Sequence, residues 1–260
     1  MMDQYFRIDY KLELEKKLSN YFLIFFDKIP GYYFGLLTVF FGGISIILSY
    51  ILYTSIDNSY SIFTHYISDL GIGPNGANLS FAFGLPIMSL MAFFYHLSEI
   101  YRSKKLAIYR FLLVPVWLSI ISNAIGGILA GIFDITFLMH SVAAFLYFTG
   151  VILYYLMLLI LTIVEKNVNK TELILYAIVF GTSSFFLGIS LISFLFPDLS
   201  DIISITFTEW IAVFSYLPAI LIRSLYLLQM NNKKKEIEEY AQYLIILNNK
   251  YMHFNIEEVS

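Results

Sequence analysis

Apolar residues occur in six long stretches along this chain, and polar segments separate each stretch from the next. The stretches cover residues 32–53, 79–100, 111–133, 137–164, 173–196 and 207–230. Each exceeds the roughly 20 residues that a helix needs to cross a hydrocarbon core about 30 Å thick. None shows the alternation of apolar and polar residues expected of a membrane barrel strand. The pattern therefore predicts an all-α fold with six membrane-spanning helices in one bundle.

Basic residues divide the connecting segments into two sets. The segments after the first, third and fifth stretches contain no Lys or Arg, whereas the sixteen bases lie in the other segments, at the chain ends, and at Arg223 near the end of the sixth stretch. Because basic residues accumulate on the cytoplasmic side of membrane spans, we expect both termini to be cytoplasmic. The external side then carries six acidic residues and no base, five in the three loops and Glu209 at the start of the sixth stretch. A surface of that sign attracts metal ions or amine headgroups.

The composition agrees with a membrane protein. Of the residues, 59% are hydrophobic and only 13% are charged, against about 25% charged in soluble domains. The chain has no cysteine, so disulfides and thiolate metal sites are excluded. Its basic clusters are short and suit anionic lipid at the cytoplasmic surface. The predicted partners are therefore membrane lipids and not nucleic acid.

Two amphipathic segments flank the predicted membrane domain at 31–230. Residues 1–30 and 231–260 mix apolar and charged residues, so we expect a cytoplasmic interfacial helix at each end. These helices could instead recruit a cytoplasmic protein partner, which would make the protein a scaffold. Within the third stretch, Gly127 and Gly131 form a pair that lets two helices approach closely. We interpret the pair as packing within the bundle, with a homodimer face as the alternative.

Polar residues gather near the external ends of the predicted spans. The loop at 54–78 holds His65 and Asp69, which a helix over 61–70 ended by Gly71 would place on one face. A turn is predicted around Asn75, which lies between a proline and a glycine. Three further polar residues are expected at the same membrane depth: Asp134, His140 and Glu209. Asn123 is expected deeper, within the third span.

We expect His65, Asp69, His140 and Glu209 to share one outward-facing pocket, because ionisable side chains in a bilayer are costly and usually face a bundle interior. These residue types suit a general acid and base. They also suit a metal, but no His-x-x-x-His pair supports one, and no metal or cofactor is predicted. Structural explanations exist as well. Asp69 could fix the loop, His140 could cap or reach the interface, and Glu209 could stabilise a helix N-terminus.

Two further polar residues, His96 and Glu99, lie at the cytoplasmic end of the second stretch. We interpret them as interfacial partners of Arg102. Asn123 is then the one strongly polar residue expected deep in the spans, apart from Ser and Thr. The lack of charges at mid-span argues against a transporter of ions or protons.

Four short motifs occur in order along the spans. They are Ile67-Ser68-Asp69-x-Gly71-x-x-Pro74 followed by Phe81 or Phe83, the segment from Ser119 to Asn123, His140-x-x-x-Ala144-x-x-x-Phe148-x-Gly150 with Tyr154 beyond, and Glu209-Trp210. In order and sidedness they resemble the Frag/DRAM/Sfk family of membrane proteins, and a related bacterial and archaeal family of uncharacterised six-span proteins. The resemblance covers about residues 32–230. It departs at Asn75, where the family often has a second proline, and the long tails lack a family pattern.

The resemblance implies a lipid-linked role: remodelling of lipid anchors, control of phospholipid kinases or leaflet asymmetry, or modulation of autophagy. It also implies that the functional positions are Ser68, Asp69, Gly71, Asn123, His140 and Glu209. We therefore predict a protein that binds or regulates membrane lipids, without catalysis, through an acidic external pocket. The predicted binding residues are Ser68, Asp69, Gly71, Asn75, Asn123, Asp134, His140 and Glu209. The alternative is a membrane-embedded lipid hydrolase or transferase whose catalytic candidates are His65, Asp69, His140 and Glu209.

Overall fold

The computed structural model describes residues 21–22, 24–102, 112–133, 135–136, 138–164, 169–196 and 205–257, with side chains of the last helix described as far as residue 242. The elements are α2 (Gly31–Thr54), the short 3-10 helix η1 (Ile67–Ile72), α3 (Ala77–Arg102), α5 (Leu113–Ile132), α6 (Leu138–Val164), α7 (Lys170–Leu195) and α8 (Ile205–Glu257). Six of these helices, all except η1, are long and apolar enough to cross a membrane. The prediction of an all-α bundle with six spans is confirmed, and the protein is a multi-pass membrane protein.

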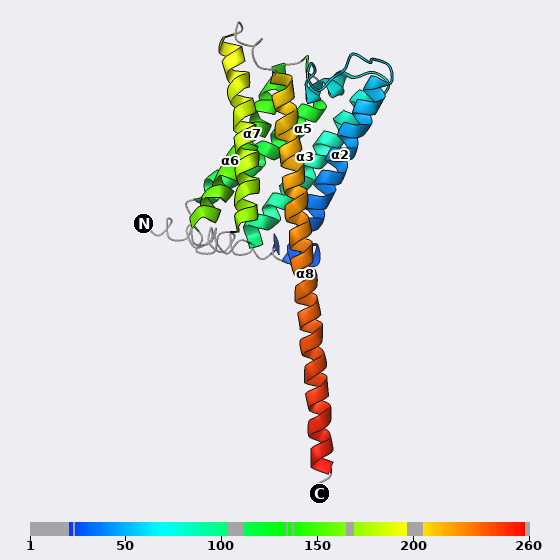
Figure 1. Ribbon diagram of the computed structural model, residues 1–260, viewed down its shortest axis with the longest axis vertical. Helices are drawn as coiled ribbons and strands as arrows, with labels where there is room; N and C mark the ends of the chain where they lie inside the picture. The colour runs from blue at the N-terminus through cyan, green and yellow to red at the C-terminus, as the bar shows by residue number, and fades with distance from the viewer. Residues whose placement is uncertain are drawn as a thin grey trace, which may run out of the picture.

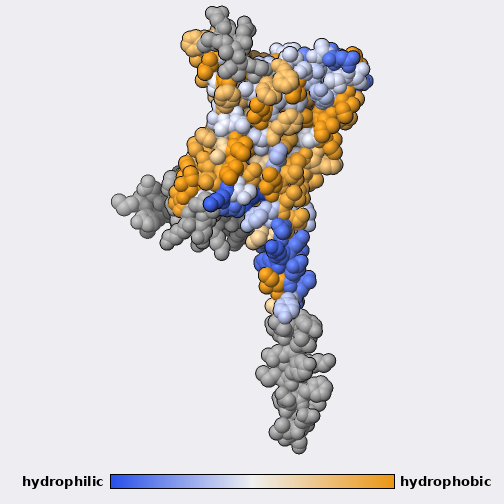
Figure 2. Space-filling model, in the orientation of Figure 1, coloured by the Kyte–Doolittle hydropathy of each residue, from blue (hydrophilic) through white to orange (hydrophobic). Residues whose placement is uncertain are grey.

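The six long helices form a closed ring in chain order (Figure 1). Each helix packs on the next, from α2 through α3, α5, α6 and α7 to α8, and α8 returns to pack on α2. The end of the bundle that carries the 54–78 loop is called the loop end below, and the end from which α8 continues is called the tail end. Between these two ends, the visible face of the bundle is covered mainly by apolar side chains (Figure 2).

The paired glycines of α5 pack inside the bundle. A Cβ atom at Gly127 would lie 2.0 Å from the Ser89 Oγ, and one at Gly131 would lie 2.4 Å from the Pro86 Cδ. Both neighbours belong to α3, so any larger side chain at these positions would push α3 and α5 apart. The interpretation of this pair as intramolecular packing is confirmed.

The tail is helical, but it is not a separate helix. α8 runs without interruption from Ile205 to Glu257 and extends well beyond the tail end of the bundle (Figure 1). No Gly or Pro occurs between residues 231 and 257 to end the helix. Asn231 continues the contacts of the bundle, since its side-chain amide donates to the Tyr32 hydroxyl at 3.1 Å. The predicted N-terminal interfacial helix lies largely outside the described residues.

The loop between α2 and α3 differs from the predicted helix over 61–70. Turns at the start of this segment lead into η1, and Gly71 lies within that 3-10 helix instead of ending an α-helix in a left-handed conformation. The predicted turn is present: Asn75 has φ 58° and Gly76 has φ 83°. The Ala77 N–H donates to the Pro74 carbonyl across this turn at 3.0 Å. The left-handed backbone explains why Asn and Gly, which tolerate it best, occupy these two positions.

Candidate functional site

The 54–78 loop is held on the first turns of α8 by three long-range hydrogen bonds. The Ile67 N–H donates to the Glu209 carboxylate at 2.8 Å. The Trp210 indole N–H donates to the His65 carbonyl at 3.0 Å, and the Thr206 hydroxyl donates to the Phe63 carbonyl at 2.9 Å. The loop and Glu209 therefore meet. The expected pocket is not shared by all four residues, since His140 and Glu209 line the same cavities but neither His65 nor Asp69 lines them. Trp210 is 2% exposed, so the loop covers it and it does not belong to an interfacial belt.

Glu209 is the buried acid of the loop end. Its side chain is 5% exposed, and it accepts the Ile67 N–H at the start of η1. The backbone N–H and the hydroxyl of Ser68 are also hydrogen-bonded to this carboxyl group. All of these partners are neutral donors. A buried carboxylate held only by neutral groups keeps much of its desolvation cost, which a ligand of opposite charge would offset.

Asp69 braces the loop from within. Its carboxylate accepts the Tyr66 N–H at 2.7 Å, and the Tyr60 hydroxyl donates to the Tyr66 carbonyl at 2.8 Å. Burial raises the pKa of the Asp69 carboxyl above its ordinary value, while the Tyr66 N–H and the nearby His65 and His140 act in the opposite direction. Asp69 therefore performs the loop-fixing role that was the structural explanation for it.

The two histidines of the predicted pocket face different partners. The Nδ1 of His140 lies 2.7 Å from the Phe133 carbonyl oxygen. Because a carbonyl only accepts, this contact requires a proton on Nδ1, so in the neutral ring Nε2 is the acceptor. The His65 ring stacks on Tyr60 at 4.8 Å, and its Nδ1 lies 2.9 Å from the Thr64 hydroxyl. Within the described residues, no three His, Asp or Glu side chains are placed to hold a metal ion.

The remaining predicted residues lie apart from Glu209. Asn123 is 2% exposed between α5 and α6, where its amide donates to the Tyr147 carbonyl at 3.4 Å. Asn75 is exposed and bonds the Ser55 hydroxyl at 3.1 Å, which ties the turn to the end of α2. Gly71 packs on Phe81 within the loop. Asp134 lies outside the described residues. The loop end therefore brings together Ser68, Asp69, His140 and Glu209, and separates them from Asn75 and Asn123.

Three cavities meet around Ser68 and His140. A small one of about 50 Å³ lies inside the ring and is lined by Ser68, His140 and Glu209 together. A larger one of about 520 Å³ is lined by the same three residues and continues between α6 and α7. A third, of about 200 Å³, includes Ser68, Gly71 and His140 and lies between η1, α3 and α5. Among the residues that the structure describes, no Lys or Arg lines any of the three cavities.

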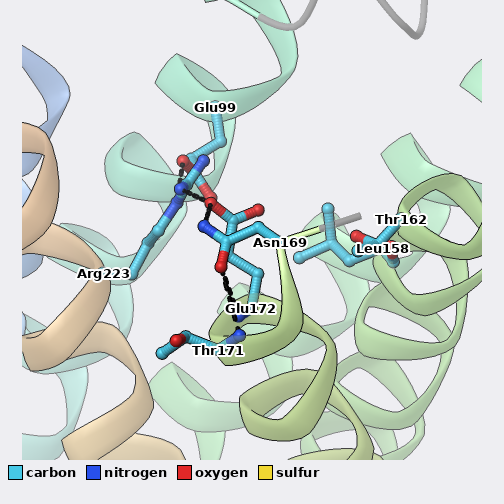
Figure 3. Close-up of polar contacts among 7 residues, drawn as sticks. All are labelled: Glu99, Leu158, Thr162, Asn169, Thr171, Glu172 and Arg223. Carbon is cyan, nitrogen blue, oxygen red and sulfur yellow. Dashed lines mark hydrogen bonds and ion pairs between the residues drawn. The ribbon is translucent and has the colours of Figure 1, made fainter. Parts of the chain in front are cut away.

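A second polar cluster, at the tail end, was not predicted. Arg223 of α8 bonds Glu99 of α3 at 3.3 Å and also pairs with Glu172 of α7 (Figure 3). Asn169 caps α7, accepting the Thr171 N–H at 3.1 Å, and its amide donates to Glu172 at 3.0 Å. These contacts join α3, α7 and α8 through one guanidinium. The signal in the sequence was the set of charges at the ends of apolar stretches, which ion pairing inside a bundle explains.

The interpretation of His96 as an interfacial residue is wrong, and Glu99 has a partner that was not predicted. The Arg102 side chain, their expected partner, lies outside the described residues. Glu99 pairs with Arg223. His96 is 2% exposed, and its Nε2 lies 3.1 Å from the Tyr216 hydroxyl in the bundle core. The core thus contains a second strongly polar residue besides Asn123. One acid spaced three residues from a histidine gives no indication of which helix will face it, so the sequence alone did not identify these partners.

Comparisons with protein-family models, with curated proteins and with solved structures found no match to this chain.

Proposed function

We propose that the protein binds membrane lipids at its loop end, with the polar part of the lipid at Ser68, His140 and Glu209 and an acyl chain in the cleft between α6 and α7. We also propose that this end faces the outside of the cell or the lumen of an organelle, in keeping with the basic residues of the opposite segments. The observation that carries the proposal is the cavity of about 520 Å³, which is lined by these three polar residues together with a mainly apolar wall that also includes Ser141 and Ser190.

The cleft is amphipathic in the way that a lipid is. Its wall includes Phe148 and Phe186, whose ring centroids lie 4.5 Å apart with the rings tilted by 59°. Phe145, Leu191 and Phe194 also line it, and they are 52%, 54% and 81% exposed on the outside of the bundle. Such side chains face hydrocarbon in a membrane, so a chain can enter from the bilayer without crossing water. The volume lies within the range of about 300–1,000 Å³ usual for ligand sites.

The polar end is set by tertiary contacts. Glu209 and Ser68 come from segments about 140 residues apart, and the Ile67 N–H holds them together. His140 is fixed by the Phe133 carbonyl, in the connection between α5 and α6. A site whose side chains are already held in place loses less conformational entropy on binding. This preorganisation supports a binding role for residues that would otherwise be costly to bury.

Photo-crosslinking tests the proposal. The full-length protein is reconstituted in vesicles that contain a phospholipid with a photoactivatable acyl chain, and adducts are mapped by mass spectrometry. We expect adducts on α6 and α7 near Phe145 and Leu191. Ala144, which lines both the small and the large cavity, is replaced in Ala144→Trp to fill the cleft, and those adducts should be lost. Leu118→Trp is the matched control, since Leu118 is 61% exposed and lines none of the three cavities.

A lipid-modifying enzyme is the second candidate, because Ser68, His140 and Glu209 are residue types of a nucleophile, a base and an acid and they line one cavity. The contacts favour binding over this chemistry. Ser68 bonds Glu209, and the Nδ1 of His140 is engaged by a backbone carbonyl and not by a carboxylate. Release of fatty acid or headgroup from vesicle lipid by the wild type, lost in Ser68→Ala, would establish the enzyme instead.

A further inference from the structure

The polar end of the cleft offers hydrogen-bond acceptors and no cation. The Glu209 carboxylate accepts the Ile67 N–H through Oε2 and also bonds Ser68. Because a carboxylate has about four lone-pair sites, it retains capacity for a ligand. The hydroxyl of Ser68 can accept as well as donate. His140 has its proton on Nδ1, which leaves the lone pair of Nε2. All three residues line the same small cavity of about 50 Å³, so a ligand in it lies within reach of each of them.

This arrangement matches one class of headgroup. A primary ammonium has three N–H donors and a positive charge, so it can bond three acceptors and balance the carboxylate of Glu209. A trimethylammonium group has the charge but no N–H donor. A phosphate placed at Glu209 itself would be repelled by the carboxylate, and the described linings of the cavities hold no Lys or Arg to receive it. The ammonium of an amine phospholipid, and not its phosphate, is therefore the group that fits at Glu209. The guanidinium of Arg223 pairs with Glu99 and Glu172 at the tail end of the bundle, away from this site.

We propose that the site selects lipids whose headgroup carries a primary amine, with the ammonium bonded to Glu209, Ser68 and His140 and the acyl chain in the cleft between α6 and α7. This proposal rests on the proposed lipid-binding function and names the ligand class of that site. It explains why an acid is buried at the loop end with neutral partners. The carboxylate gains its counter-charge from the ligand and not from the chain.

A series of N-methylated lipids tests the selection without any variant. Wild-type protein in vesicles is crosslinked with one photoactivatable acyl-chain probe, and phosphatidylethanolamine, its monomethyl and dimethyl forms, and phosphatidylcholine compete in turn. Replacing the three N–H donors by methyl groups should weaken competition by at least about tenfold, the loss expected for one charge-assisted hydrogen bond or more. Equal competition by phosphatidylethanolamine and phosphatidylcholine overturns the amine proposal. Absence of any adduct in the cleft overturns lipid binding itself, so the two failures are distinguishable.

Two variants assign the preference to its residues. Glu209→Gln keeps an oxygen for the Ile67 N–H but removes the charge. Cleft adducts should therefore persist, while the ratio of competition by phosphatidylethanolamine to competition by phosphatidylcholine should fall close to one. Ser68→Ala removes one acceptor and should reduce the preference less. The control is Leu118→Trp, with an unchanged preference. A Glu209→Gln protein that still prefers phosphatidylethanolamine as strongly as the wild type contradicts the proposal. If Glu209→Gln does not fold, an undiminished preference in Ser68→Ala contradicts it in the same way.

Discussion

At each end of the bundle, α8 contacts acidic side chains that are buried or partly buried, and the two places differ in how the negative charge is balanced. At the tail end, Arg223 forms ion pairs with Glu99 and Glu172, and its guanidinium also lies 5.6 Å from the centroid of the Tyr226 ring. At the loop end, Glu209 has only neutral donors and lies beside three cavities, two of which it lines. The first cluster is completed by the chain itself and connects three helices. In the second, no described cation of the chain balances the charge of Glu209, which is expected of a site that binds a ligand.

The largest effect should come from removing the guanidinium. Arg223→Met leaves Glu99 and Glu172 at the edge of the membrane domain without their counter-charge, and breaking a buried ion pair in this way costs about 3–5 kcal/mol. The cost falls toward the lower bound here because Arg223 retains 20% exposure. The measurement is the thermal unfolding midpoint of the purified protein in detergent, and we expect a clear fall.

Two further variants make that result specific. Lys234→Met breaks an exposed pair with Glu238 at 3.5 Å, in which the lysine is 75% exposed, so its effect should stay within about 1 kcal/mol. The triple variant Glu99→Gln, Glu172→Gln, Arg223→Met removes all the charges and should recover most of the stability. If Arg223→Met and Lys234→Met unfold at the same temperature, the tail-end cluster is not a structural connection.

Glu209→Gln should affect stability less than Arg223→Met. The amide oxygen can still accept the Ile67 N–H, and no buried counter-charge is left behind. We expect a change within about 1 kcal/mol, measured by the same thermal unfolding, together with the loss of amine preference described above. A fall as large as that of Arg223→Met would show that both clusters are structural, and the contrast between the two ends would fail.

Trp210→Phe should loosen the loop without unfolding the bundle. The variant keeps most of the ring packing against Phe214, at 5.5 Å between centroids, but removes the hydrogen bond to the His65 carbonyl. The lost bond is worth about 1 kcal/mol. The expected result is faster cleavage of the 54–78 loop by an added protease, at an unchanged unfolding temperature. Unchanged cleavage would show that the loop is held without this contact.

The smallest effect concerns pH and Asp69. Burial raises the pKa of its carboxyl above the ordinary value of about 3.9, so the folded protein binds this proton more tightly than the unfolded chain. Its contribution to stability is therefore greatest below the ordinary pKa and is lost as pH rises through the folded value. Asp69→Asn should remove this pH dependence. The free energy of unfolding of the variant should therefore increase relative to that of the wild type as pH rises from about 4 toward neutrality. An identical pH dependence in both proteins would contradict this assignment.

The periodicity of apolar residues predicted the spans well because bilayer thickness fixes their length, and α2, α3, α5, α6 and α7 begin and end within a few residues of the predicted bounds. Because burying an ionisable group is costly, we expected Glu209 and His140 to face the bundle interior near the loop, and both line a cavity there with Ser68. The helix over 61–70 was wrong, because the Asp69 carboxylate and the bonds to α8 determine the conformation of that segment. The partner of Glu99 depends on which helix ends meet at the tail end of the bundle, and the periodicity of apolar residues carries no such information.

Crosslinking with a phosphatidylethanolamine probe in reconstituted vesicles tests the central contrast most directly. We expect adducts concentrated on α6 and α7 beside Phe145 and Leu191. These adducts should be lost in Ala144→Trp. They should be retained in Leu118→Trp and in an Arg223→Met protein kept below its unfolding temperature. Adducts spread evenly over all the lipid-facing helices, and unchanged by Ala144→Trp, would show that the loop end holds no lipid site.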